Sequence, residues 1–123
     1  MAKILMAASR PYWVRGIASL LENKKHEIFY SLDSRSTLNS TSEVGLDAIL
    51  MDLEIAKSSL SEIKKEFPGL IVAVWGNLPY SKGKKIESSD VKYFERVGAG
   101  YLKVVDYLEE RLKAAAHSSS ERP

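Results

Sequence analysis

The sequence predicts an α/β domain with three layers, in which about five helices cover a five-stranded parallel sheet. Three observations predict this fold class. Short apolar runs alternate with amphipathic stretches along most of the chain, which is the pattern of repeated β–α units joined by right-handed crossovers. The runs at residues 47–52 and 70–75 are almost continuously apolar, as in central strands that helices cover on both faces. The length of 123 residues suits one core and is too short for two.

The first unit contains a strand at residues 4–8 and a helix that begins near Pro11. Proline is favoured in the first turn of a helix because it has no N–H to lose there. Val14, Ile17 and Leu21 follow at helical spacing and indicate one apolar face.

The second strand is expected at residues 26–32. Residues 33–45 are rich in Ser, Thr and Asn, so we expect only a short or frayed helix, or a loop, in that segment. The third strand follows at residues 48–53, and a helix at 58–67 ends before Pro68, which cannot continue it.

The last two units are less regular. A strand at 70–75 leads into a polar loop at 76–86. Ser and Asp side chains at the start of residues 88–97 can cap a fourth helix there. A fifth strand is expected at 100–104, and Asp106 can cap the last helix.

Composition limits the function classes. We expect one domain at residues 1–116 and a polar, disordered tail at 117–123. The formal net charge of +2 is too small to indicate nucleic acid or an acidic membrane as partner. The chain has no cysteine, so it has neither disulfides nor thiolate metal sites. Without a signal-peptide pattern or a long apolar stretch, a cytoplasmic location is expected.

Three segments together resemble response-regulator receiver domains, which belong to the CheY-like superfamily. They are residues 10–22, residues 47–53 and residues 98–103 (GAGYLK). The resemblance implies the flavodoxin-like strand order 2-1-3-4-5 and puts Asp52, at the end of the third strand, in the place of the phosphoacceptor. It also implies a role in two-component signal transduction.

The chain departs from the family at the residues that support phosphorylation. Receivers hold Mg²⁺ with a pair of acids after the first strand, where this chain has Ala8 and Ser9. Neither can replace a carboxylate as ligand of a hard cation. The hydroxyl-bearing residue that receivers place at the end of the fourth strand is missing, because Trp75 and Gly76 stand there.

The resemblance also implies two degenerate positions near the fifth strand. The position of the phosphate-binding lysine falls on Val104, with Lys103 one residue early. Tyr101 matches the aromatic residue that many receivers rotate between two states. We therefore expect an inactive Asp52 that accepts hydrogen bonds from nearby backbone, or from Ser9 or Arg10.

These departures predict an atypical receiver that acts through phosphorylation-independent protein–protein contacts. By the resemblance, a protein partner or a second copy would bind the face made by the fourth helix, fifth strand and fifth helix. The residues expected on that face are Lys92, Tyr93, Arg96, Tyr101 and Tyr107. We expect no enzyme activity, no cofactor, no metal site and no membrane contact, and nucleic acid is disfavoured.

Two alternatives stay open at this point. The chain could be a conventional receiver that is still phosphorylated on Asp52. It could also be a small α/β ligand-binding module or enzyme that uses a cleft at the carboxyl edge of the sheet, where such folds bind ligands. Trp75 could fill that cleft or be a wall of the core. The two histidines, His26 and His117, belong to no triad or metal motif.

Overall fold

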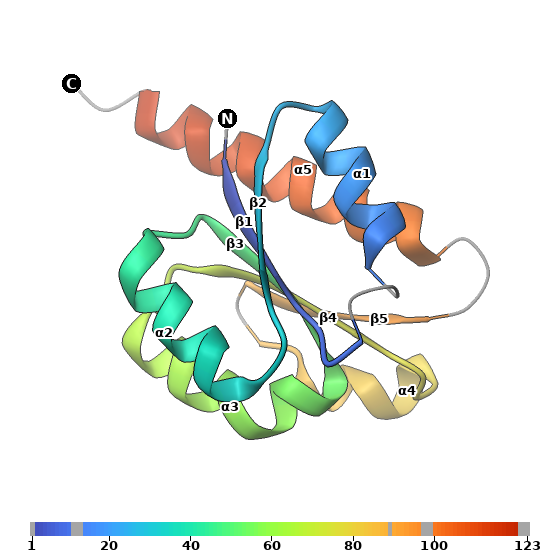
Figure 1. Cartoon of the computed structure of the whole chain (residues 1–123). Helices are drawn as coiled ribbons and strands as arrows, with labels where there is room; N and C mark the ends of the chain where they lie inside the picture. The colour runs from blue at the N-terminus through green and yellow to red at the C-terminus, as the bar shows by residue number, and fades with distance from the viewer. Residues whose placement is uncertain (1, 11–13, 89, 97–99, 121–123) are drawn as a thin grey trace.

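A computed structural model describes residues 2–10, 14–88, 90–96 and 100–120. Its centre is a parallel sheet in the order β2-β1-β3-β4-β5, which confirms the predicted fold class and strand order (Figure 1). The five strands are β1 Lys3–Ala7, β2 Glu27–Ser31, β3 Ala48–Asp52, β4 Ile71–Gly76 and β5 Val91–Glu95. The helices are α1 Arg15–Asn23, α2 Ser34–Val44, α3 Leu53–Glu66, α4 Tyr80–Gly83, the 3-10 turn η2 Lys84–Ile86, and α5 Gly100–Ser120.

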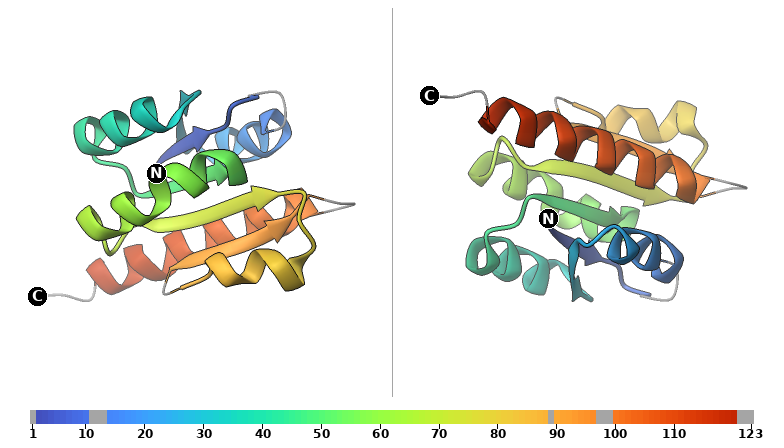
Figure 2. Two further views of the ribbon diagram at one scale, coloured as in Figure 1. Left: turned by 90° about the horizontal axis from the view of Figure 1, so that it is seen from below. Right: turned by 90° about the horizontal axis from the view of Figure 1, so that it is seen from above.

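The helices form two layers around the sheet (Figures 1 and 2). Alternate residues of each strand point to opposite faces, so β1 sends Ile4 and Met6 toward α1 and α5, and Leu5 toward α2 and α3. The short α4 lies beside β5, on the side of α2 and α3 (Figure 1). Among the described helices, none is long and apolar enough to span a membrane.

The predictions for the last two elements were wrong. The expected helix at 88–97 is strand β5, and the expected strand at 100–104 is the start of α5. β5 is an edge strand with polar residues such as Lys92 on it, so it lacks the continuous apolar run of a central strand. In α5, Val104 and Leu108 are buried at helical spacing. The helix continues to Ser120 and so includes residues 117–120.

The segment expected to be a frayed helix or a loop is an ordered helix, α2. Asp33 caps its first turn by accepting a hydrogen bond from the Ser36 N–H at 2.8 Å. Gly45 follows the last turn with φ 73°, a left-handed conformation that glycine adopts without strain. Thr37 and Thr41 are buried and donate their hydroxyls to backbone carbonyls one turn earlier. Capping and internal hydrogen bonds therefore offset the poor helix propensity of this segment.

Two further boundaries differ from those expected. α3 begins at Leu53, five residues before the predicted 58, and residues 80–86 of the expected polar loop form α4 and η2. Pro11, expected in the first turn of the first helix, lies outside the described residues.

The Asp33 cap predicts a pH-dependent contribution to stability. The hydrogen bond from the Ser36 backbone N–H lowers the pKa of Asp33 below the ordinary 3.8. A lowered pKa in the folded state stabilises the fold above the unfolded pKa, and the effect is lost as pH falls through the folded pKa. Asp33→Ala should therefore destabilise the protein in urea unfolding at pH 7 and do so less at pH 3.

Asp33→Asn is the matched control, because asparagine caps helices well but does not titrate. Its difference from the parent protein should change with pH as the aspartate becomes protonated. Equal effects of Asp33→Ala at both pH values would show that the carboxylate charge does not contribute.

Candidate functional site

Asp52 is both the last residue of β3 and the N-cap of α3, with no loop between the two elements. Its side chain is 2% exposed. One carboxylate oxygen accepts the Ile55 N–H at 2.9 Å. The other accepts the N–H of Ser9 at 2.7 Å and its hydroxyl at 2.9 Å. Hydrogen bonds from backbone and from Ser9 are confirmed, and both oxygens of Asp52 are occupied by the protein itself.

The residues after β1 supply apolar packing and donors in place of carboxylates. Ala8 is 1% exposed and belongs to the core on the side of α1 and α5. Ser9 donates hydrogen bonds to Asp52 from both its N–H and its hydroxyl. In the described part of the chain there is no group of three or more His, Asp or Glu side chains that could hold a metal ion.

The end of β4 is packed tightly. Trp75 is 5% exposed and belongs to the same apolar cluster as Ala8 and Phe94, so it is a wall of the core. Its indole nitrogen is buried and has no hydrogen-bond partner among the described residues. At Gly76 a Cβ would come within 2.9 Å of the Tyr93 hydroxyl oxygen and 3.0 Å of the Leu53 Cβ. The close approach of these neighbours favours a residue without a side chain at this position.

The positions expected on the fifth strand lie elsewhere. Lys103 and Tyr101 are exposed residues in the first turn of α5, and Val104 is buried one residue later. The residue that follows β5 is Arg96, whose N–H donates to the Gly76 carbonyl at 2.7 Å. The predicted positions for the phosphate-binding lysine and the rotating aromatic were therefore wrong, because they assumed a strand at 100–104.

The aromatic residue that β5 does carry is Tyr93. It is 1% exposed, and its hydroxyl donates to the Leu78 carbonyl at 2.8 Å. Burial raises the pKa of this hydroxyl. The ring lies so close to Gly83 of α4 that a Cβ at that position would overlap it. Tyr93 is therefore a fixed core residue and cannot contribute to a contact surface, contrary to the expectation.

Two glutamates link α4 and β5 through hydrogen bonds. Glu87 accepts the Tyr80 hydroxyl at 2.7 Å and the Tyr93 N–H at 2.9 Å, and its bond to Tyr80 raises the pKa of that hydroxyl. Glu95 accepts the Tyr80 N–H at 3.0 Å. Ser88 and Val91 exchange backbone hydrogen bonds. The start of the β5 edge is therefore paired within the chain, which protects it from strand addition.

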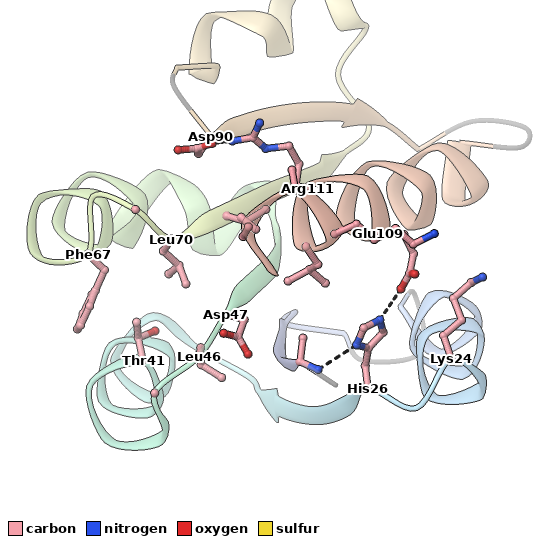
Figure 3. A pocket seen from close by; sticks show the side chains of 18 of the residues that line it. Lys24, His26, Thr41, Leu46, Asp47, Phe67, Leu70, Asp90, Glu109 and Arg111 are labelled. Carbon is pink, nitrogen blue, oxygen red and sulfur yellow. Dashed lines mark hydrogen bonds and ion pairs between the residues drawn. The ribbon is translucent and has the colours of Figure 1, made fainter. Parts of the chain in front are cut away.

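Two grooves stand out on the described part of the protein, and Asp52 lines neither. The larger, of about 970 Å³, is shown in Figure 3. It lies at the amino edge of the sheet, whereas Asp52 is at the carboxyl end of β3. The smaller, of about 330 Å³, lies between the start of β5 and α5 and is lined by Lys92 and Tyr107. A ligand site in a carboxyl-edge cleft beside Asp52 gains no support from these positions.

Comparison with known proteins gives the fold. No protein-family model and no curated protein matches the chain. Among solved structures, a response-regulator receiver domain from Clostridium thermocellum is similar over 94% of this chain and 98% of its own, with a TM-score of 0.78 and 20% identity. The chain has the fold of a receiver domain.

Other solved structures with receiver domains are similar to this chain in fold. The receiver domain of the Francisella response regulator 1452 is similar over 94% of this chain and 99% of its own, with a TM-score of 0.75 and 15% identity. RcsB from Salmonella enterica, solved bound to the promoter rprA, is similar over 93% of this chain and 63% of its own, with a TM-score of 0.74 and 19% identity.

The structure shows which elements are formed by the three segments that resemble receiver domains. Residues 47–53 contain β3, as expected, and also the start of α3, which was expected at residue 58. Residues 10–22 include most of α1. The segment at 98–103 enters α5 instead of forming the fifth strand. The fold was therefore predicted correctly although one of its three supporting motifs was misplaced.

Proposed function

We propose that this receiver-fold domain is an atypical receiver, a non-enzymatic signalling module that acts through protein–protein contacts without phosphorylation of Asp52. The observation that carries the proposal is the state of the carboxylate. Within the described residues its two oxygens accept three hydrogen bonds, from Ser9 and Ile55, and the residue is 2% exposed. A phosphoacceptor oxygen must be reached by the phosphodonor, and a buried carboxylate that caps α3 and binds Ser9 offers little access.

The described residues in the places of the family's metal ligands also lack groups that would hold a cation for phosphoryl transfer. Catalysis of that reaction depends on positioning and on cations that neutralise the developing negative charge. Magnesium is held by carboxylates and other oxygen ligands, whereas Ala8 is apolar and buried and the Ser9 hydroxyl already donates to Asp52. Gly76 has no room for a hydroxyl side chain.

Protein contacts are best supported at a surface made by β5 and the first half of α5. We define this β5–α5 surface by Lys92, Arg96, Tyr101 and Tyr107. Tyr101 is 42% exposed, and Tyr107 is half-buried with its ring 5.5 Å from that of Phe94. Tyrosine and arginine are the residues that contribute most often to binding hot spots. The partner would be another protein or a second copy of this chain.

Incubation with acetyl phosphate and Mg²⁺, followed by intact-mass measurement, tests the proposal. The mass should stay unchanged for the parent protein. A receiver of known competence, treated in parallel, shows that the reagent is active. A phosphoryl adduct that disappears in Asp52→Asn would contradict the proposal. An adduct found only in Ser9→Ala would support it, because that variant frees one oxygen of Asp52 from the hydroxyl.

A further inference from the structure

The groove at the amino edge is built from elements far apart in the sequence (Figure 3). Its floor contains the starts of β1, β3 and β4. One wall is the second half of α5, and the other is the end of α2 with the turn after α3. Large apolar residues line it, of which Phe67, Leu46 and Leu112 are half-buried. The groove therefore offers an apolar bed that the described part of the chain does not cover.

Two side-chain pairs hold the α5 wall in place. His26 accepts the Ala2 N–H on Nδ1 at 3.1 Å, so its Nε2 donates to Glu109 of α5. Arg111, also on α5, forms an ion pair with Asp90 at the start of β5. Figure 3 shows both pairs beside the groove. Because the wall is fixed from both sides, the groove is a persistent feature of the fold.

α5 extends well beyond the sheet that it covers (Figures 1 and 2). Its 21 residues correspond to about 31 Å, whereas a five-residue strand spans about 17 Å. Leu108 is buried and Leu112 half-buried, but Lys113, Ala114 and Ala115 are exposed. A short helical segment without packing has little stability in water, so the end of α5 would gain from a partner.

The negative charge that lines the groove is complementary to a lysine near the end of α5. Opposite the α5 wall lies Asp47, whose carboxylate accepts the Lys3 N–H at 2.8 Å and lines the groove. The C-terminal end of α2 also lines it, and the partial negative charge of a helix C-terminus favours cations. On α5, Lys113 lines the same groove and has no ion pair within the described residues.

We propose that the amino-edge groove is the interface of a two-fold symmetric dimer, in which the second half of α5 from each copy lies in the groove of the other. Such an interface uses the same patch on both copies. Leu112 of one copy then packs against the apolar bed of the other, and Lys113 pairs with Asp47 of the second copy. Two-fold symmetry gives two such pairs per dimer.

Sedimentation equilibrium of the full chain over a wide concentration range tests the proposal. The parent protein should form a dimer in a concentration-dependent manner. Lys113→Glu and Asp47→Lys should each weaken the dimer by about tenfold or more, since two attractive pairs become repulsive. An equimolar mixture of these two variants should dimerise as the parent protein does, because both pairs then join opposite charges.

Lys57→Glu, the same charge reversal on the exposed face of α3, is the matched control and should leave the dimer unchanged. A chain that stays monomeric throughout, or a mixture that fails to recover, would overturn the proposal. So would a dimer that Lys92→Glu disrupts and Lys113→Glu does not, and that result would assign self-association to the β5–α5 surface. Binding of a different protein in the groove of a strictly monomeric chain would also overturn it.

Discussion

Replacing Asp52 with alanine is expected to lower the free energy of unfolding by about 3 kcal/mol. The substitution removes the cap of α3, which contributes about 1 kcal/mol in comparable helices. It also leaves the N–H and hydroxyl of Ser9 without their charged acceptor, and hydrogen bonds to charged groups contribute about 1.5–3 kcal/mol each. Solvent can reach Ser9 and would replace part of that loss. Urea unfolding followed by circular dichroism measures the effect.

Asp52→Asn should have an intermediate effect. The amide oxygen can still accept hydrogen bonds from one side, either from Ile55 or from Ser9, while the NH₂ group faces donors on the other side. Asp106→Ala, which removes an exposed aspartate from α5, is the control and should change stability by less than about 0.5 kcal/mol. A loss below about 1 kcal/mol for Asp52→Ala would contradict a structural role for this carboxylate.

This role affects how cellular experiments are interpreted. Under the proposed function, a variant at Asp52 would lose signalling because less of the protein is folded, even if phosphorylation never occurs. A destabilisation of a few kcal/mol can change the abundance of a protein in cells several-fold. Signalling by Asp52 variants should therefore be normalised to the amount of folded protein before it is attributed to a missing phosphoryl group.

Strands β1, β3 and β4 could be predicted from sequence because central strands are buried on both faces. β2 is the other edge strand, and its run of Ile28, Phe29 and Tyr30 indicated it. All five residues of β3 and all six of β4 are buried, and this burial produces the apolar runs seen in the sequence. β5 could not be found in that way. As an edge strand it carries exposed Lys92 and half-buried Glu95, and its polar flanks resemble those of a capped helix.

The error at β5 had a consequence for the candidate site. Residues 98–103 resembled a family segment, and this resemblance placed the expected strand nine residues too far along the chain. Val91, Tyr93 and Phe94 are β-branched or aromatic residues typical of strands, and they were the signal that could have located β5. With the strand placed correctly, Arg96 becomes the residue that follows it.

The site at Asp52 was predictable in part. The bond from Ser9 was foreseen, but the capping role was not, because the next helix was expected to begin at residue 58. An aspartate followed at once by the helix formers Leu53, Glu54 and Ala56 was the available signal. The pair between His26 and Glu109 joins residues 83 apart in the chain, and no local pattern indicates such a contact.

Gly83→Ala is expected to lower the free energy of unfolding by about 2–3 kcal/mol. The backbone of Gly83 has helical angles, with φ −68° and ψ −30°, so alanine would suit the conformation. The new Cβ would overlap the ring of Tyr93, which is 1% exposed and cannot move into solvent. Overpacking a filled core costs about 1–3 kcal/mol and sometimes more. Urea unfolding, together with hydrogen exchange of the Tyr93 amide, measures the loss of this packing.

Gly16→Ala is the matched control, because Gly16 lies in α1 with nothing within 4 Å of a Cβ. Alanine should raise the free energy of unfolding there by up to about 1 kcal/mol, since it lowers the entropy lost on helix formation. In a Tyr93→Leu background the smaller side chain leaves room, so Gly83→Ala should become neutral or stabilising. The interaction energy of that double-mutant cycle should exceed about 1.5 kcal/mol. If Gly83→Ala destabilises equally in both backgrounds, the close packing of α4 on Tyr93 is not what requires a glycine at this position.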